Sequence, residues 1–258
     1  MSELGGPDTL SAKTSADTLL RLLANVADAA LDDVVRAAEL FAACVRDNGV
    51  IQAFGTGHSQ GTALEIAGRA GGLIPTNRIA LSDLVQFGGE DPSVLSDPML
   101  ERRGDVSARL YELAEPQPQD LFVIASSSGV NASVVEMANV VTSAGHKLVA
   151  ITSVDHTKRV TPKHESGKRL VDFADVTLDN GAPFGDTLLS LPDGTSAGAM
   201  SSLSAALLVQ MVVAETVRIL LANGTQPPVY VSNNVPGGHE RNSKLEALYA
   251  GRIRRTAS

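Results

Sequence analysis

Apolar runs alternate with helical patterns between residues 50 and 179. Runs typical of buried strands cover 50–54, 73–76, 120–125, 147–152 and 175–179. Helical patterns cover 60–71, 103–113 and 131–144. Pro75 favours an edge or strand-end position for the second run, because proline cannot donate to a ladder. Strands that alternate with helices predict an α/β fold, a parallel five-stranded sheet with helices on both faces.

Further patterns flank this region. Residues 15–47 carry two apolar stripes and predict two helices, or one helix with a break near residues 28–30. We expect short helical turns in an insertion over 81–105, and a long glycine- and proline-rich loop over 180–194, of a kind that is often functional. A largely apolar helix is expected over 196–222, an extended segment over 228–233 and a terminal helix over 240–252. These patterns predict a disordered tail over 1–13 and a single domain over 14–258.

Composition narrows the class of protein. The chain has 258 residues, 43% of them hydrophobic, and a formal net charge of −8, so we expect no nucleic-acid partner. Cys44 is the single cysteine, which excludes an internal disulfide and indicates a buried thiol. The N-terminus lacks a basic-then-apolar signal, and the apolar stretch 203–214 is too short to span a bilayer. We therefore expect a cytoplasmic protein without a membrane partner.

Two polar loops that follow strands share one design. The first reads GTGHS at 55–59 and the second reads SSSGVN at 126–131. Each ends an apolar run and opens a helical pattern, which places backbone N–H groups and hydroxyls at a helix N-terminus. Neither loop contains lysine or arginine. The pattern predicts a phosphate site built from neutral donors.

Nucleotide motifs fit these loops poorly. A dinucleotide fingerprint requires a third glycine at position 60, which is Gln60, and an acidic residue about 20 positions further on, which is missing. No P-loop motif is present in the sequence. A nicotinamide-dependent dehydrogenase is therefore disfavoured, and we expect no cofactor.

The paired loops resemble the phosphate loops of the SIS (sugar isomerase) domain family, which includes phosphoheptose isomerase and N-acetylmuramic acid 6-phosphate etherase. The segments 180–186 (NGAPFGD) and 233–238 (NNVPGG) resemble a stand-alone branch of that family. The resemblance extends from about residue 16 to residue 252 and implies a flavodoxin-like fold, a phosphorylated sugar or amino sugar as ligand, and a homodimer or homotetramer. It assigns phosphate binding to Thr56, Ser59, Ser126, Ser127, Ser128 and Asn131.

Catalysis on such a ligand requires an acid or base. Glu65 lies on the helix after the first loop, although the isomerase and the etherase of the family place their glutamate further along, where this chain has Arg69. His58 lies inside the first loop, and His239 with Glu240 forms a second pair. The C-terminal region that holds this pair reaches the active site in related proteins, sometimes that of a neighbouring subunit. A solvated helix face for Glu65 and a favourable helix N-terminal charge for Glu240 remain alternatives.

Two functions follow from these observations. The first is a sugar-phosphate isomerase or a related lyase or etherase, with no required metal because the histidines lack zinc-type spacing. The second is a non-catalytic sugar-phosphate sensor or regulatory module. The first 48 residues show helices but no basic helix-turn-helix, so a sensor would act through another protein.

Overall fold

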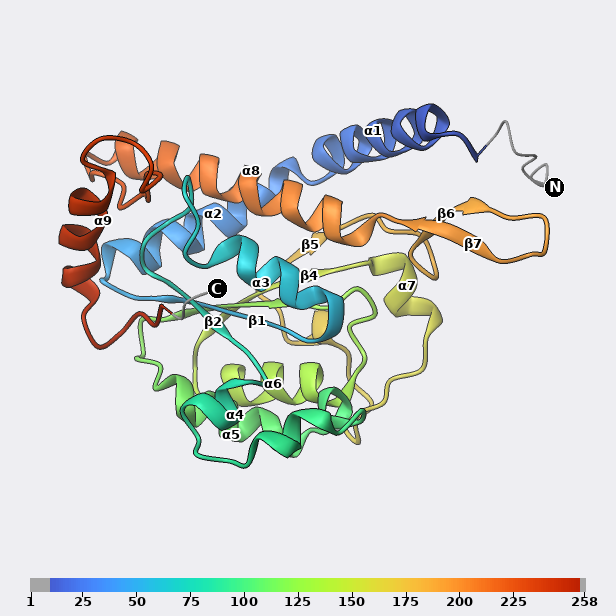
Figure 1. Cartoon of the computed structure of the whole chain (residues 1–258), viewed down its shortest axis with the longest axis horizontal. Helices are drawn as coiled ribbons and strands as arrows, with labels where there is room; N and C mark the ends of the chain where they lie inside the picture. The colour runs from blue at the N-terminus through green and yellow to red at the C-terminus, as the bar shows by residue number, and fades with distance from the viewer. Residues whose placement is uncertain (1–9, 256–258) are drawn as a thin grey trace.

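A parallel sheet forms the centre of the molecule (Figure 1). The computed structural model describes residues 10–255. The strand order is β2-β1-β3-β4-β5, and all neighbours are parallel. This confirms the predicted α/β fold with a five-stranded parallel sheet. The strands are β1 (Ile51–Gly55), β2 (Thr76–Ile79), β3 (Leu121–Ala125), β4 (Lys147–Thr152) and β5 (Val176–Asp179).

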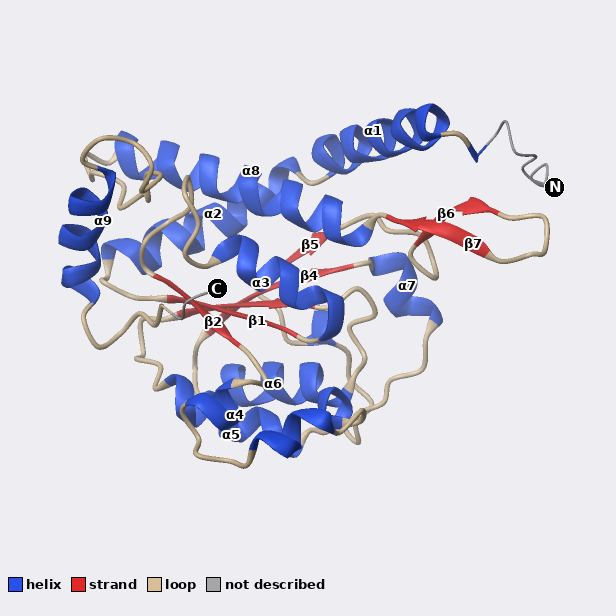
Figure 2. Ribbon diagram, viewed as in Figure 1, coloured by secondary structure: helices blue, strands red, loops and turns tan. Residues whose placement is uncertain are grey.

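Alternate residues of each strand enter two separate cores. Ala53 and Val123 face one helical layer, whereas Phe54 and Phe122 face the other. Figure 2 shows the two layers on opposite sides of the sheet. Strands that are buried on both faces read as continuous apolar runs, which is why their positions are visible in the sequence. The first layer holds α2 (Leu31–Arg46), α3 (Gln60–Ile66) and α8 (Ser201–Ala222), and the second holds α4 (Asp83–Gln86), α5 (Asp105–Ala114) and α6 (Ala132–Ser143).

The N-terminal region forms two helices that meet at Ala30, which confirms the predicted break. The first, α1 (Ala12–Ala29), begins where the Ser11 hydroxyl accepts from the Thr14 N–H at 3.1 Å. Within this helix, the buried residue is Val26. The expected tail over 1–13 therefore overlaps the start of α1, and residues 1–9 lie outside the described part of the chain.

The second strand lies later than predicted. β2 begins at Thr76, whereas Leu73 makes an isolated antiparallel bridge to Val229 in the segment that was expected to be extended. The Pro75 carbonyl accepts from the Ile51 N–H at 2.9 Å, so pairing with β1 begins at the proline carbonyl and continues through Thr76. The predicted edge position is confirmed, since β2 ends the strand order.

The segment expected to be a loop contains a two-stranded hairpin. It consists of β6 (Thr187–Ser190) and β7 (Ser196–Ala199), which pair in antiparallel fashion. As a result the long helix α8 begins at Ser201 and not at residue 196. Asp193 accepts from the Thr195 N–H at 2.9 Å in the connecting turn. The Asp193-Gly194 dipeptide between these strands is a hairpin signal that the sequence interpretation missed.

Helix α8 corrects the expectation that no segment is long enough for a membrane. By length and composition alone, its 22 residues would cross a bilayer. It packs against α2 and α3, however, and Leu208, Val212 and Leu220 are buried in the first core. We conclude that α8 is a core helix of this layer.

Cys44 is buried, as predicted. Burial raises the pKa of its thiol to about 12, so the thiol stays protonated and unreactive at neutral pH.

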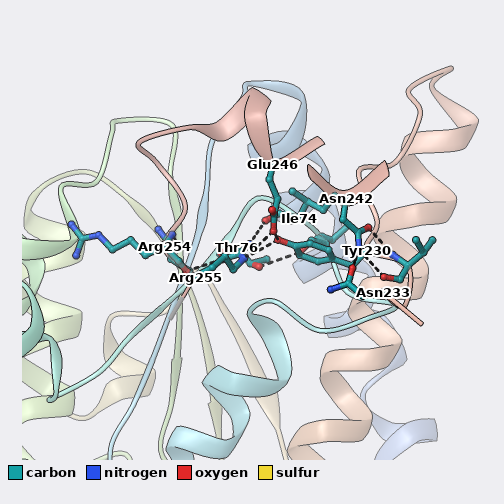
Figure 3. Close-up of polar contacts among 11 residues, drawn as sticks. Ile74, Thr76, Tyr230, Asn233, Asn242, Glu246, Arg254 and Arg255 are labelled. Carbon is teal, nitrogen blue, oxygen red and sulfur yellow. Dashed lines mark hydrogen bonds and ion pairs between the residues drawn. The ribbon is translucent and has the colours of Figure 1, made fainter. Parts of the chain in front are cut away.

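The C-terminal segment returns to the edge strand after α9 (Gly238–Glu246), as Figure 3 shows. The Asn77 amide donates to the Arg252 carbonyl at 2.7 Å and accepts from the Arg254 N–H at 2.7 Å. Arg255 donates to the carbonyls of Ile74 and Thr76 at 2.8 and 2.7 Å. These contacts attach residues 252–255 to the start of β2.

Candidate functional site

The two polar loops lie side by side at the carboxyl edge of the sheet. In the β1–β3 register, Gly55 pairs with Ala125, so both loops begin at the same level. The chain passes from β1 outward to β2 and then returns to the other side of β1 as β3. Ligands of open α/β sheets bind at such a reversal of strand order.

The first loop turns tightly into a 3₁₀ turn, η2 (Gly57–Ser59), and then into α3. A β-carbon at Gly55 would lie 2.5 Å from the Ser59 carbonyl oxygen, so this turn requires glycine. Thr56 is buried, Ser59 is partly buried, and His58 is exposed to solvent. The Ser59 side chain is therefore partly enclosed at the carboxyl edge of the sheet, whereas the His58 side chain lies on the surface of the protein.

The second loop is held from both sides. The Ser126 hydroxyl accepts from the Gly129 N–H at 3.1 Å, and the Ser127 carbonyl accepts from the Ser153 N–H at 3.1 Å. Among the described residues, the buried Ser127 hydroxyl has no hydrogen-bond partner. An unpaired buried polar group is costly, and a ligand would satisfy it.

A small cavity joins the two loops. Three parts of the chain that the sequence interpretation had not assigned to phosphate binding also line this cavity. They are the first residues of α8, the residue after β5, and Thr62 on α3. The serine pair Ser201-Ser202 is a sequence signal that would have suggested the start of α8. The lining residues are Ser59, Thr62, Ser126, Ser127, Ile151, Asn180, Ser201, Ser202 and Ala205.

Asp186 fixes the start of α8 at this cavity. Its carboxylate accepts from the N–H groups of Met200 and Ser201 at 3.2 and 2.8 Å, and from the Ser201 hydroxyl at 2.5 Å. A carboxylate at a helix N-terminus is favoured by the helix dipole. The glycine-rich segment 180–186 therefore positions α8.

Replacing Asp186 by alanine removes this cap. We expect a loss of about 1–2 kcal/mol in the free energy of unfolding, measured by urea denaturation. Asp193→Ala is the matched control, because Asp193 accepts from Thr195 within the exposed turn of the hairpin, and its replacement should cost less than about 0.5 kcal/mol. Equal losses in the two variants would contradict the capping role.

A lysine from outside the two loops contacts the second loop, whereas the loops themselves contain only neutral donors. The Lys163 amino group donates to the Asn131 side-chain oxygen at 3.2 Å, and the Lys163 N–H donates to the Val130 carbonyl at 3.2 Å. Lys163 lies 32 residues from Asn131, in a loop without regular structure, so no local motif indicates the contact. A cation at this position favours an anionic ligand.

Glu65 does not line this cavity. Its carboxylate accepts from Arg69 four residues along and from the Gln210 amide at 2.6 Å. Glu65 therefore bridges α3 and α8, in agreement with a structural role for the residue.

His239 and Glu240 lie far from the loops within one chain. They belong to α9, which Figure 1 shows on the opposite side of the molecule from the β6–β7 hairpin. His239 lines a separate cavity with Tyr230 and Arg255, at the start of the strands, and Glu240 pairs with Lys244 at 2.6 Å on the surface. The expectation that this pair acts beside the serine loops is not met within a single chain.

The cavity beside His239 has its own polar network (Figure 3). The Tyr230 hydroxyl donates to Glu246 at 2.5 Å and accepts from Arg255 at 2.7 Å. Burial, and then the Glu246 carboxylate, raises the pKa of Tyr230 to about 12, so the phenol remains a donor. The donors of Arg255 are directed at protein acceptors, which indicates that this network anchors the C-terminal segment.

Glu101 is the acidic residue that the structure brings to the first loop. It lies in the 3₁₀ turn η4 (Leu100–Arg102), within the insertion, and a β-carbon at Gly57 would lie 3.0 Å from its Oε2 atom. The insertion lacks periodicity, so the sequence held no signal that Glu101 would lie close to the first loop.

Within residues 10–255, no group of three or more His, Cys, Asp or Glu side chains is arranged to hold a metal ion.

Comparisons with known proteins agree with this architecture. The family model of the SIS domain matches residues 16–153. A UPF0309 protein of Listeria monocytogenes is 38% identical over 227 residues, which cover 86% of this chain and 90% of that protein.

Two solved structures share the fold. Phosphoheptose isomerase from Neisseria gonorrhoeae superposes with a TM-score of 0.52 at 20% identity, covering 77% of this chain and 92% of that one. A phosphoheptose isomerase from Francisella tularensis gives a TM-score of 0.54 at 13% identity, covering 79% and 95%. At these identities the similarity concerns the fold.

Proposed function

Because the chain belongs to the SIS domain family, we propose that it binds a phosphorylated sugar or amino sugar at the two loops. The observation that carries this proposal is the adjacency of the loops at the reversal of strand order, with the Ser127 hydroxyl of the second loop buried at their shared cavity and without a partner among the described residues. Ser59, Ser126, Ser127 and Ser128 supply hydroxyl donors, Thr56 and Asn131 flank them, and Lys163 adds a positive charge.

We propose that the reaction is a sugar-phosphate isomerisation, or a related elimination by a lyase or etherase. Both reactions need a group that accepts a proton from a carbon atom of the bound phosphosugar. The Glu101 carboxylate beside Gly57 and the exposed His58 support this proposal, since both lie at the first loop.

A non-catalytic sugar-phosphate sensor is the second candidate. It is favoured by the ion pair that engages Glu65 and by the distance of His239 and Glu240 from the loops. Proton exchange on a bound phosphosugar separates the two functions, because a sensor has no need to catalyse it.

We also propose a cytoplasmic homodimer or homotetramer. Large apolar side chains remain exposed on helices of the first layer, among them Leu64 on α3 and Leu203 and Leu221 on α8. Such side chains support a further protein surface against this layer.

Thermal denaturation with a ligand panel tests the proposed function. A ligand that binds only the folded state raises the melting temperature, and a concentration of 100 times Kd adds about 2.7 kcal/mol. We expect a shift with at least one sugar phosphate or amino-sugar phosphate, and none with the same sugar lacking phosphate. If no phosphosugar shifts the transition, or if the unphosphorylated sugars shift it equally, the proposal is wrong.

A further inference from the structure

Glu101 lies between the two loops. Its carbonyl oxygen accepts a hydrogen bond from the hydroxyl of Ser133, in the first turn of α6 directly after the second loop. Its carboxylate faces the first loop, as the 3.0 Å approach to a β-carbon at Gly57 shows. The backbone of η4 is therefore fixed to the start of α6, while the side chain faces the first loop.

The Glu101 carboxylate is free to act on a ligand. Within the described part of the chain it has neither a hydrogen-bond nor an ion-pair partner, although it is partly buried. The nearby cation Arg103 is engaged elsewhere, with Asp105 at 2.5 Å and with Asp97 at 3.7 Å. By contrast, the Glu65 carboxylate is already bound by Arg69 and Gln210.

The residue opposite Glu101 leaves room for this carboxylate. Gly57 has φ = +55° and no side chain, and any β-carbon there would press on Oε2. Because like charges repel, a carboxylate is expected beside the sugar and away from its phosphate. Glu101 approaches Gly57, whereas Ser59 lines the cavity between the loops, which agrees with that separation.

We propose that Glu101 is the catalytic base that moves a proton between C1 and C2 of the bound sugar phosphate, an inference that rests on the proposed function. Starting from a ketose, the carboxylate takes a proton from C1, and the electron pair forms a C1–C2 double bond while the C2 carbonyl oxygen takes up a proton from solvent water. The protonated Glu101 then returns its proton to C2, and the C1 hydroxyl gives its proton back to water as the C1 carbonyl forms. The atoms and electrons balance without a cofactor.

Solvent proton exchange tests this assignment directly. The protein is incubated in D₂O with D-ribulose 5-phosphate, D-fructose 6-phosphate or D-sedoheptulose 7-phosphate, and loss of the C1 proton signal is followed by NMR. We expect exchange by the wild-type protein and a loss of at least about 100-fold in Glu101→Gln, with the thermal shift by the same sugar phosphate preserved. Glu112→Gln is the control, since Glu112 is exposed on α5 and pairs with Arg109 on the same helix.

Each outcome decides a separate point. Exchange in Glu101→Gln at the wild-type rate would overturn the base role. The base role would also be overturned if the wild-type protein bound the ketoses but exchanged the C1 proton of none of the three. Loss of both exchange and thermal shift in a folded Glu101→Gln would make Glu101 a binding residue and overturn the base role as well. If none of the three shifts the wild-type transition but another phosphosugar does, the base role fails and the proposed function stands. If no phosphosugar does so, the proposed function fails.

Discussion

Replacing Ser59 and Ser128 together by alanine is expected to weaken phosphosugar binding by roughly 10²- to 10⁴-fold. Each hydroxyl would donate to a charged phosphate oxygen, and one such bond contributes roughly 1.5–3 kcal/mol. Ser59 lines the cavity between the loops, and Ser128 precedes the turn at Gly129. The two serines belong to different loops, so the double variant weakens both halves of the site.

Titration calorimetry with the best ligand of the panel measures the change in affinity. Ser93→Ala combined with Ser143→Ala is the matched control, because both serines are exposed and lie outside the loops. The Ser59 and Ser128 double variant should keep the melting temperature of the unliganded wild-type protein, since neither loop serine is expected to stabilise the free protein strongly. Unchanged affinity in the Ser59 and Ser128 variant would mean that phosphate is bound elsewhere.

Replacing Asp120 by alanine is expected to lower the free energy of unfolding by about 3–5 kcal/mol. The Asp120 side chain is fully buried and accepts from four donors. These are the Arg252 guanidinium at 2.6 Å, the Val50 N–H at 2.9 Å, the Gln52 amide at 3.0 Å and the Gln117 N–H at 3.1 Å. Alanine would leave these donors without a carboxylate acceptor at the start of β1 and β3.

Urea denaturation measures this loss. Asp17→Ala is the control, because the ion pair of Lys13 and Asp17 is exposed on α1 and should contribute about 0.3–0.5 kcal/mol. A loss below about 1 kcal/mol for Asp120→Ala would show that the buried carboxylate is replaceable.

Local patterns predicted most of the sheet. The strands that carry the loops, β1 and β3, have all five residues buried and read as apolar runs. Two local features account for the errors. Pro75, whose effect on the strand bounds was underestimated, delays β2 to Thr76, and the Asp193-Gly194 turn, which was missed, makes a hairpin before α8.

Side-chain chemistry at the site was less predictable than the loops themselves. The sequence indicated Glu65 because it lies on the helix after the first loop, yet helical spacing gives it Arg69 as a partner four residues along. Lys163 and Glu101 reach the loops from segments without periodicity, so their positions follow from how those segments pack.

The sequence alone determined the α/β class, the two polar loops after β1 and β3 and the break at Ala30, because each follows from a local pattern of residues. Tertiary structure alone decided which charged groups meet those loops. It brought the start of α8 and the Lys163 segment to the carboxyl edge, it placed Glu101 over Gly57, and it placed His239 at the other edge. The physical reason is that a parallel sheet sets the ends of distant strands beside one another, whereas the connections between them carry no period that reveals where they return.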